Sequence, residues 1–398
     1  MLPCLVMAQD FSENWKEYFS YYNITDLHES NNQIYAAAEN AYFVYDVSTQ
    51  QVETVTSIQG LSGDLISKIY HSDRHGLTCV GYQNGLLQII MDNNQSIFTV
   101  VDIRDKISIS PNDKQINDFF EYEDILYIST DFGIAEYNLE RLEFEDSFFI
   151  GNNGTQIQVN QMTVQNDKIY AATTEEGIKT ANLKISNLID YQVWQTEYPG
   201  NWKGVLSFSD VVFGLNQNNS ISKLENGSST PFDQVGANIT GITGFNVSGG
   251  QLLITASNQV LAYNEQLNLE ASINELDKAS FNINTTVFSS GNYYLGHSSL
   301  GLLKLETSSS STFSALSPDG PLLNRIFSLK ATPTDLWVTF GEYSQFLNPY
   351  PITYRGLSHL MPDGWVNLDV KEDLGNAAEL SEVTIDPTNP NRVYVSSY

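Results

Sequence analysis

A short apolar motif recurs along this 398-residue chain at nearly constant intervals. It starts with apolar or aromatic residues and ends in small ones, as in IYAAA, LYIST and IYAAT. Its seven copies begin at Ile34, Leu77, Leu126, Ile169, Val211, Leu252 and Tyr293. The steps between copies are 41 to 49 residues, the length that a four-stranded propeller blade requires. The sequence therefore predicts an all-β fold, a seven-bladed β-propeller.

Each repeat has the same internal order. An apolar strand comes first, for example residues 66–71, followed by a polar turn and the recurring motif. A second turn, such as Gln83-Asn84-Gly85, leads to a third strand, and a more polar fourth strand ends the unit. Gly and Asn suit these turns because they accept positive φ at low cost. One blade exposes both flat faces, so stacking seven blades around an axis is the arrangement that buries them.

The repeat also predicts domain limits. Residues 1–9, MLPCLVMAQ, are typical of the end of an export signal. Residues 10–310 would form the propeller, with Trp15–Tyr21 closing the last blade as an outer strand. A serine-rich run near residue 310 marks a junction. The motif then restarts at Leu336 and Val393, so residues 311–398 are expected to begin a second, incomplete propeller.

The net charge of the chain excludes some classes of binding partner. The chain carries 19 Lys and Arg against 47 Asp and Glu, a formal net charge of −28. Nucleic acid and anionic membrane surfaces would repel such a surface. No long apolar run predicts a membrane span. Of the two cysteines, Cys4 lies in the expected signal, so Cys79 would remain as a buried, inert thiol in a chain without an internal disulfide.

The residue patterns predict no reaction centre. His71 and His75 are four residues apart but flank a turn without a third ligand, so we interpret them as solvated histidines and not as zinc ligands. Acidic pairs such as Glu143 with Glu145 are typical of solvated strands in so acidic a chain. No G-x-S-x-G turn supports a nucleophile, and no loop predicts a phosphate or calcium site. We expect neither a metal nor another cofactor, and no enzyme activity.

Two aromatic segments are candidate contacts for a partner protein or a glycan. Aromatic side chains with polar tips suit both kinds of contact. The residues are Trp194 and Trp202 in YQVWQTEYPGNW, and Tyr343, Phe346, Tyr350 and Tyr354 in GEYSQFLNPYPITYRG. The second segment is an insertion relative to the repeat, and insertions in repeat folds fall in loops that often bind. Packing between blades is the alternative for both segments.

The order of several motifs resembles one known family. WKEYFSYYNITDL is followed by IYAAAENAYFVYD, by GLSGDLISKIYHSDRHGLTCVGYQNGLLQII and by DKQINDFFEYEDILYISTDFGIAEYNL. This series is similar to the N-terminal propeller of PorZ-like proteins, which are components of the type IX secretion system. The likeness spans nearly the whole chain and is densest from Trp15 to about Gly151. The sensor propellers of two-component regulators share part of the pattern.

The resemblance implies two seven-bladed propellers and a C-terminal β-sandwich domain, and we expect neither the complete second propeller nor the β-sandwich in the sequence given. It implies an exported protein at the cell surface, in a complex that trims secreted cargo and attaches it to anionic lipopolysaccharide. The implied partners are the sortase-like protease PorU and the outer-membrane barrel proteins PorV and PorQ. The lipopolysaccharide-binding role is associated with the region beyond this chain's end, so no ligand-binding residue is carried over.

Two functions remain open from the sequence. The first is a non-enzymatic scaffold whose rigid propeller faces hold the partner proteins of a surface complex. The second is a periplasmic propeller that senses oligosaccharides for a hybrid two-component regulator. A membrane-spanning helix and a kinase after Tyr398 would favour the sensor, and a β-sandwich would favour the scaffold.

Overall fold

The structure, a computed structural model, describes residues 16–184, 187–232, 239–305, 311–341, 355–370 and 373–397. These residues form antiparallel β-strands and three short 3-10 turns, η2 (Pro111–Asp113), η3 (Asn152–Gly154) and η4 (Tyr191–Val193). Two compact units divide the chain. The larger unit holds residues 22–55 and 61–317, and the smaller unit holds residues 16–21, 56–60 and those from 318 onward.

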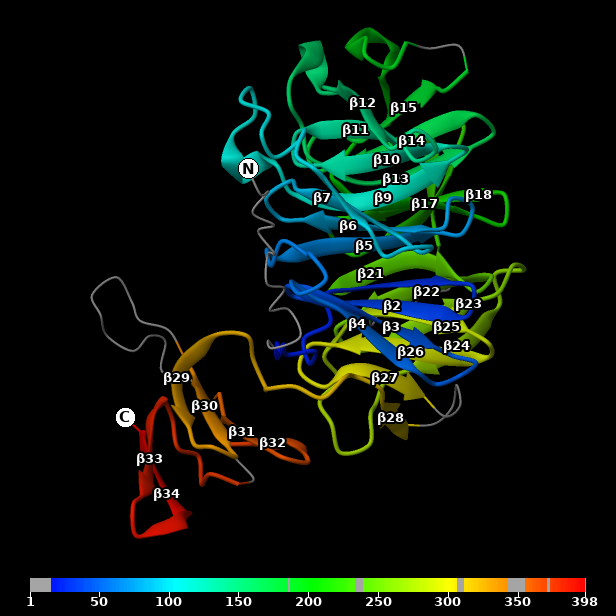
Figure 1. The fold of residues 1–398 in the computed structure, drawn as a ribbon. Helices are drawn as coiled ribbons and strands as arrows, with labels where there is room; N and C mark the ends of the chain where they lie inside the picture. The colour runs from blue at the N-terminus through cyan, green and yellow to red at the C-terminus, as the bar shows by residue number, and fades with distance from the viewer. Residues whose placement is uncertain are drawn as a thin grey trace, which may run out of the picture. The chain divides into compact units, whose positions relative to one another are not determined.

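The described strands of the larger unit form seven four-stranded sheets, each in simple chain order (Figure 1). The first four sheets are β1 (Asp26–Ser30), β2 (Gln33–Ala38), β3 (Ala41–Asp46) and β4 (Val52–Val55); β5 (Ile66–Ser72), β6 (Leu77–Tyr82), β7 (Leu87–Met91) and β8 (Ile97–Val100); β9 (Ile116–Tyr122), β10 (Ile125–Thr130), β11 (Gly133–Asn138) and β12 (Glu143–Phe148); and β13 (Val159–Gln165), β14 (Lys168–Thr173), β15 (Ile178–Asn182) and β16 (Gln195–Tyr198). The last three are β17 (Trp202–Phe208), β18 (Val211–Asn216), β19 (Ile221–Glu225) and β20 (Ser228–Pro231); β21 (Ile242–Ser248), β22 (Gln251–Ala256), β23 (Val260–Tyr263) and β24 (Leu269–Ile273); and β25 (Ile283–Ser289), β26 (Asn292–His297), β27 (Gly301–Leu305) and β28 (Phe313–Ala315). Each recurring motif of the sequence lies in the second strand of its sheet, so the repeat is confirmed as a sheet repeat.

The sheets follow one another in cyclic order. The first strand of each sheet contacts the first strand of the next, from β1 to β5 and onward to β25, which contacts β1 again. Buried apolar clusters fill the spaces between consecutive sheets, for example Ile69 and Val80 with Tyr35 between the first two. The second strands are buried on both faces because a neighbouring sheet lies on each side. The fold is all-β and propeller-like.

A β-bulge recurs at the second residue of the first strand. The pairing register skips one residue there in six sheets, namely Ser67, Asn117, Asn160, Lys203, Thr243 and Asn284. A bulge re-aims the side chain of the extra residue. Four of these side chains donate a hydrogen bond to a backbone carbonyl of the next sheet, Asn117 to Val159 (2.9 Å), Asn160 to Trp202 (2.7 Å), Thr243 to Ile283 (3.2 Å) and Asn284 to Ile24 (2.7 Å).

The bond from Asn284 to Ile24 joins the seventh sheet to the first, so it closes the cycle. The Ile24 N–H also donates to the His297 carbonyl at 3.1 Å, and the Gly301 N–H donates to the Tyr22 carbonyl at 2.8 Å.

The predicted closure by Trp15–Tyr21 is wrong. All four strands of the seventh sheet come from residues 283–315, so β28 already holds the outer position that this segment was to fill. Residues 16–21 form no strand, and Trp15 lies outside the described residues.

Asn284→Ala is expected to lower the free energy of unfolding by about 1–3 kcal/mol, because the Ile24 carbonyl loses its donor in a part-buried position. Urea denaturation of the purified chain measures the change. Ser67→Ala is the matched control: Ser67 occupies the same bulge in the second sheet, but its hydroxyl has no hydrogen-bond partner. The control is expected to stay within about 0.5 kcal/mol. Equal losses in both variants would show that the bond to Ile24 contributes nothing.

The smaller unit contains two further antiparallel sheets among its described residues. Its described strands form one four-stranded sheet, β29 (Ile326–Ala331), β30 (Leu336–Phe340), β31 (Leu357–Met361) and β32 (Gly364–Leu368), and one two-stranded sheet, β33 (Leu380–Asp386) and β34 (Asn389–Ser397). The division between units falls after Ser317 and not after residue 310, because β28 still belongs to the seventh sheet. Ser20 lies in this unit, where its hydroxyl donates to the Leu322 carbonyl at 2.7 Å.

Candidate functional site

The first strands of the seven sheets surround a cavity of about 550 Å³ in the larger unit. Its walls are mostly polar, because the bulged residues and several of their polar neighbours line it. They include hydroxyl and amide side chains such as Thr243, Gln161 and Asn246. The volume is that of a small-molecule site, although most of these side chains already serve contacts between sheets.

Three charged side chains bridge the first three sheets inside this cavity. The Lys68 ammonium lies 3.1 Å from Asp26 and 3.3 Å from Asp118, and Asp26 also accepts the Ile69 N–H at 3.0 Å. Burial alone would lower the pKa of Lys68, but the two carboxylates outweigh burial and hold that pKa above its ordinary value. Burial raises the pKa of Asp118, and Lys68 opposes this rise. The three residues form a fixed ion network whose members bind each other.

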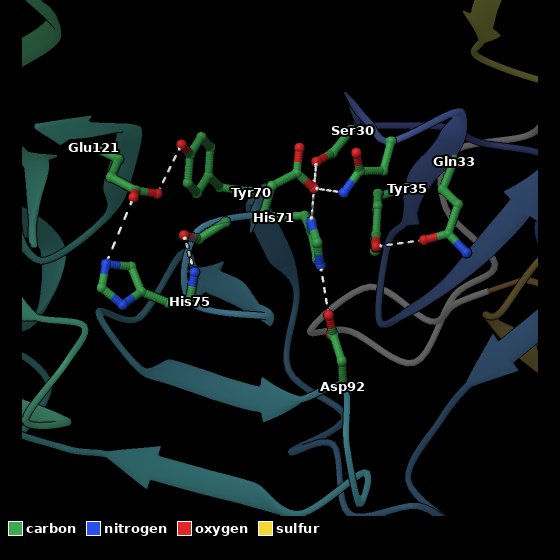
Figure 2. A network of polar contacts seen from close by, with 11 residues as sticks. Ser30, Gln33, Tyr35, Tyr70, His71, His75, Asp92 and Glu121 are labelled. Carbon is green, nitrogen blue, oxygen red and sulfur yellow. Dashed lines mark hydrogen bonds and ion pairs between the residues drawn. The ribbon is translucent and has the colours of Figure 1, made fainter. Parts of the chain in front are cut away.

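A second pocket, of about 390 Å³, adjoins the cavity where the first strands end. His71 is buried beside it, with 5% of its surface exposed, and its ring stacks on Tyr35 at 4.6 Å (Figure 2). Its Nε2 lies 2.9 Å from Asp92, and its Nδ1 lies 3.1 Å from the Ser30 hydroxyl. The prediction that His71 is a solvated turn residue is wrong, because the neighbouring sheet covers it.

Ser30, His71 and Asp92 have the composition of a hydrolytic triad but not its proton arrangement. Ser30 has one hydroxyl hydrogen and donates it to Asp73, so the His71 Nδ1 is left to donate to the Ser30 oxygen. The other nitrogen, Nε2, faces the Asp92 carboxylate, which only accepts. The Ser30 hydrogen therefore points at Asp73 and not at His71, whereas the hydroxyl hydrogen of a catalytic serine points at its general base.

Polar contacts near His71 also join the second sheet to the third. The Tyr70 hydroxyl donates to Glu121 at 3.0 Å, and the Tyr70 ring lies 4.5 Å from the ring of His28. His75 lies 3.8 Å from Glu121 (Figure 2) and 3.4 Å from Asp124. Only 11% of its side chain is exposed, so it too is less solvated than predicted. Burial, His71 and Lys68 together lower the pKa of His28 to about 4. His28 is therefore neutral at pH 7.

The two candidate tryptophans lie in the interior. Each is 5% exposed. Trp194 packs in the cluster between the third and fourth sheets and donates to the Leu188 carbonyl at 3.0 Å. Trp202 begins β17 and donates to the Tyr198 carbonyl at 3.1 Å. Their placement favours the packing alternative. The other candidates, Tyr343, Phe346, Tyr350 and Tyr354, lie outside the described residues.

Cys79 occupies the position that its sequence context indicated. It is fully buried between the second and third sheets, and burial raises the pKa of its thiol. Within the described ranges, no group of three or more His, Cys, Asp or Glu side chains is placed to hold a metal ion. In the same ranges, no helix is long and apolar enough to cross a bilayer.

The ion network of Asp26, Lys68 and Asp118 was not predicted from the sequence, although the aligned repeats indicate it. Asp26, Lys68 and Asp118 each stand two residues after the isoleucine that opens the repeat, in ITD, ISK and IND. Equivalent positions of consecutive blades adjoin each other around the axis. An acid, a base and an acid at this position in three consecutive repeats therefore predict an ion network, once the repeats are aligned on their first strands.

Comparison with known families matches residues 34–195 to the N-terminal β-propeller domain of PorZ of the type IX secretion system. Among solved structures, PorZ of Porphyromonas gingivalis, an essential surface component of that system, superposes with a TM-score of 0.79 at 15% identity. The chain resembles the N-terminal region of PorZ. The superposition covers 96% of this chain and 50% of the PorZ chain, so this chain spans about half the length of PorZ.

A second solved structure shares part of the fold. A chain of the mitotic checkpoint complex superposes with a TM-score of 0.50 at 12% identity, over 70% of this chain and 84% of that one. A search of curated proteins finds no match. At such identities the superpositions show the fold alone. The superposition on PorZ extends beyond the residues of the family match, because it covers 96% of this chain.

Proposed function

We propose that this chain is the N-terminal part of a PorZ-like component of a type IX secretion system, and that it acts as a non-enzymatic scaffold. In this proposal the larger unit is a complete seven-bladed propeller, and the smaller unit begins a second propeller. The protein would be exported and would act at the cell surface, associated with the outer membrane. The family match over residues 34–195 is the observation that carries the proposal.

The arrangement of the side chains supports a scaffold. Two polar networks connect the sheets of the larger unit. Lys68 bridges three sheets through ion pairs, and His71 contacts residues of the first and second sheets. Side chains that satisfy each other in this way rigidify a fold, and a rigid ring suits the positioning of other subunits. By resemblance, those subunits would be the sortase-like protease PorU and the barrel proteins PorV and PorQ, and anionic lipopolysaccharide would be bound outside this chain.

Affinity capture of the full-length protein from cell-surface membranes tests the proposal. We expect a secretion-associated protease and outer-membrane barrel proteins to be recovered after mild crosslinking. A full-length protein lacking residues 22–317 is the control, since it shows which partners need the larger unit. Recovery of no secretion protein, together with a measured oligosaccharide affinity of the larger unit, would favour the sensor function and refute the scaffold.

Ser30→Ala separates a scaffold from a hydrolase. The variant is expected to lose about 1–2 kcal/mol of unfolding free energy, because Asp73 and His71 lose a partner. Secretion of cargo in cells that express the variant as their only copy is expected to be unchanged. Asn284→Ala is the stability-matched control. Loss of secretion with Ser30→Ala but not with the control would show a catalytic hydroxyl, whose removal typically costs orders of magnitude in rate.

A further inference from the structure

The outer edge of the second sheet differs from the other outer edges of the larger unit. Its last strand, β8, has the sequence IFTV without a charge or a proline. The outer strands β4, β12, β16 and β24 each carry at least one glutamate, and β20 ends in Pro231. The seventh outer strand, β28, has three residues. Charges, proline and shortness are the features that keep edge strands from pairing, so β8 is the least protected edge.

The pairing register of β8 shows which of its backbone N–H and C=O groups point away from the sheet. The Met91 N–H donates to the Ser96 carbonyl at 3.0 Å, and register pairs Ile90 with Ile97 and Ile89 with Phe98. Hydrogen-bonded and non-hydrogen-bonded pairs alternate in antiparallel sheets. Phe98 therefore directs its N–H and C=O toward β7, whereas Ile97 and Thr99 direct theirs outward, at the spacing of one more strand.

Side chains beside the edge favour an apolar partner strand. Ile97 packs into the cluster between the first two sheets. The next residue, Phe98, lies on the opposite face of the strand, and 45% of its surface is exposed. Val100 packs into the cluster on the opposite side of the sheet. An added strand would extend both clusters outward and would cover the Phe98 ring.

We propose that β8 binds an extended, uncharged or basic segment of a partner protein by β-strand addition. Main-chain hydrogen bonds to Ile97 and Thr99 would supply affinity, and contact with Phe98 would supply preference for apolar residues. A second copy of this chain is the less favoured occupant, because two molecules of charge −28 repel each other. Asp92 precedes the strand and Asp102 follows it, and both are exposed, so basic residues suit the ends of the bound segment.

Fluorescence anisotropy with a labelled peptide of alternating Thr and Val, carrying a Lys at each end, tests this site on the full chain. Thr99→Pro removes the outward N–H and is expected to weaken binding at least about tenfold. Thr99→Val is the matched control, since it also loses the hydroxyl that accepts from Gln88 but keeps the N–H, and it is expected to bind as the native chain does. Phe98→Lys is expected to weaken binding similarly, and Leu269→Lys on the edge strand β24 is expected to have no effect.

Hydrogen exchange supplies a readout that does not depend on affinity. The Ile97 and Thr99 amides are expected to become protected when the peptide binds, and the unfolding transitions of the variants show that they remain folded. Absence of peptide binding, or equal binding by native chain and Thr99→Pro, would overturn the proposal. So would a dimer in solution that Thr99→Pro converts to a monomer, because the occupant would then be a second copy.

Discussion

Lys68→Met is expected to lower the free energy of unfolding by about 3 kcal/mol at pH 7. The substitution removes the cation that lies between Asp26 and Asp118 and leaves two carboxylates facing each other inside the cavity. Breaking a buried ion pair by removing one partner typically costs about 3–5 kcal/mol. The lower end applies here because 28% of the Lys68 side chain is exposed. Denaturant unfolding followed by tryptophan fluorescence measures the loss.

Two controls attribute this loss to charge and not to packing. Adding Asp118→Asn to Lys68→Met is expected to recover about 1 kcal/mol or more, since one of the two unpaired charges disappears. Lowering the pH to 4 is expected to shrink the difference between native chain and Lys68→Met, because burial raises the pKa of Asp118 and a protonated Asp118 needs no cation. A loss of the same size at both pH values would point to lost packing of the lysine stem.

Local chemistry accounts for the parts of the fold that the sequence predicted. The motifs at Ile34 and Ile169 are apolar on both faces and end in small residues, a composition that suits few positions other than the middle of a stack of sheets. Their constant spacing then defines the blade. The strand beginning at Trp202 was missed because its aromatic residue, beside Pro199 and Gly200, is also typical of a binding loop.

The polar networks could not be predicted from single segments. Asp92 follows β7, Ser30 ends β1 and Tyr35 belongs to β2, yet all three contact His71. Whether a histidine beside a turn is solvated or buried depends on which neighbouring sheet covers it. The outer strand of the seventh sheet depends on tertiary context in the same way. The sequence alone does not show whether Trp15–Tyr21 or β28 pairs with β27 at this edge.

Acidification from pH 7.5 to pH 5 is expected to destabilise the larger unit through His28. The pKa of this group is about 4 in the folded chain and about 6.5 when unfolded. The unfolded chain therefore binds a proton more readily, and stability falls as the pH drops from about 6.5 toward 4. The full difference corresponds to about 3 kcal/mol. Because His28 is only half-buried, we expect about 1–2 kcal/mol of it at pH 5.

His28→Phe isolates this contribution from the carboxylates that titrate over the same range. Phenylalanine keeps a ring against Tyr70 but takes up no proton. Unfolding free energies of native chain and variant, measured at both pH values, give the His28 contribution as the difference between their pH dependences. The variant is expected to lose less stability on acidification by about 1–2 kcal/mol. Parallel pH dependences would show that His28 is protonated in the folded chain at its ordinary pH, with its charge accommodated beside Lys68 and His71.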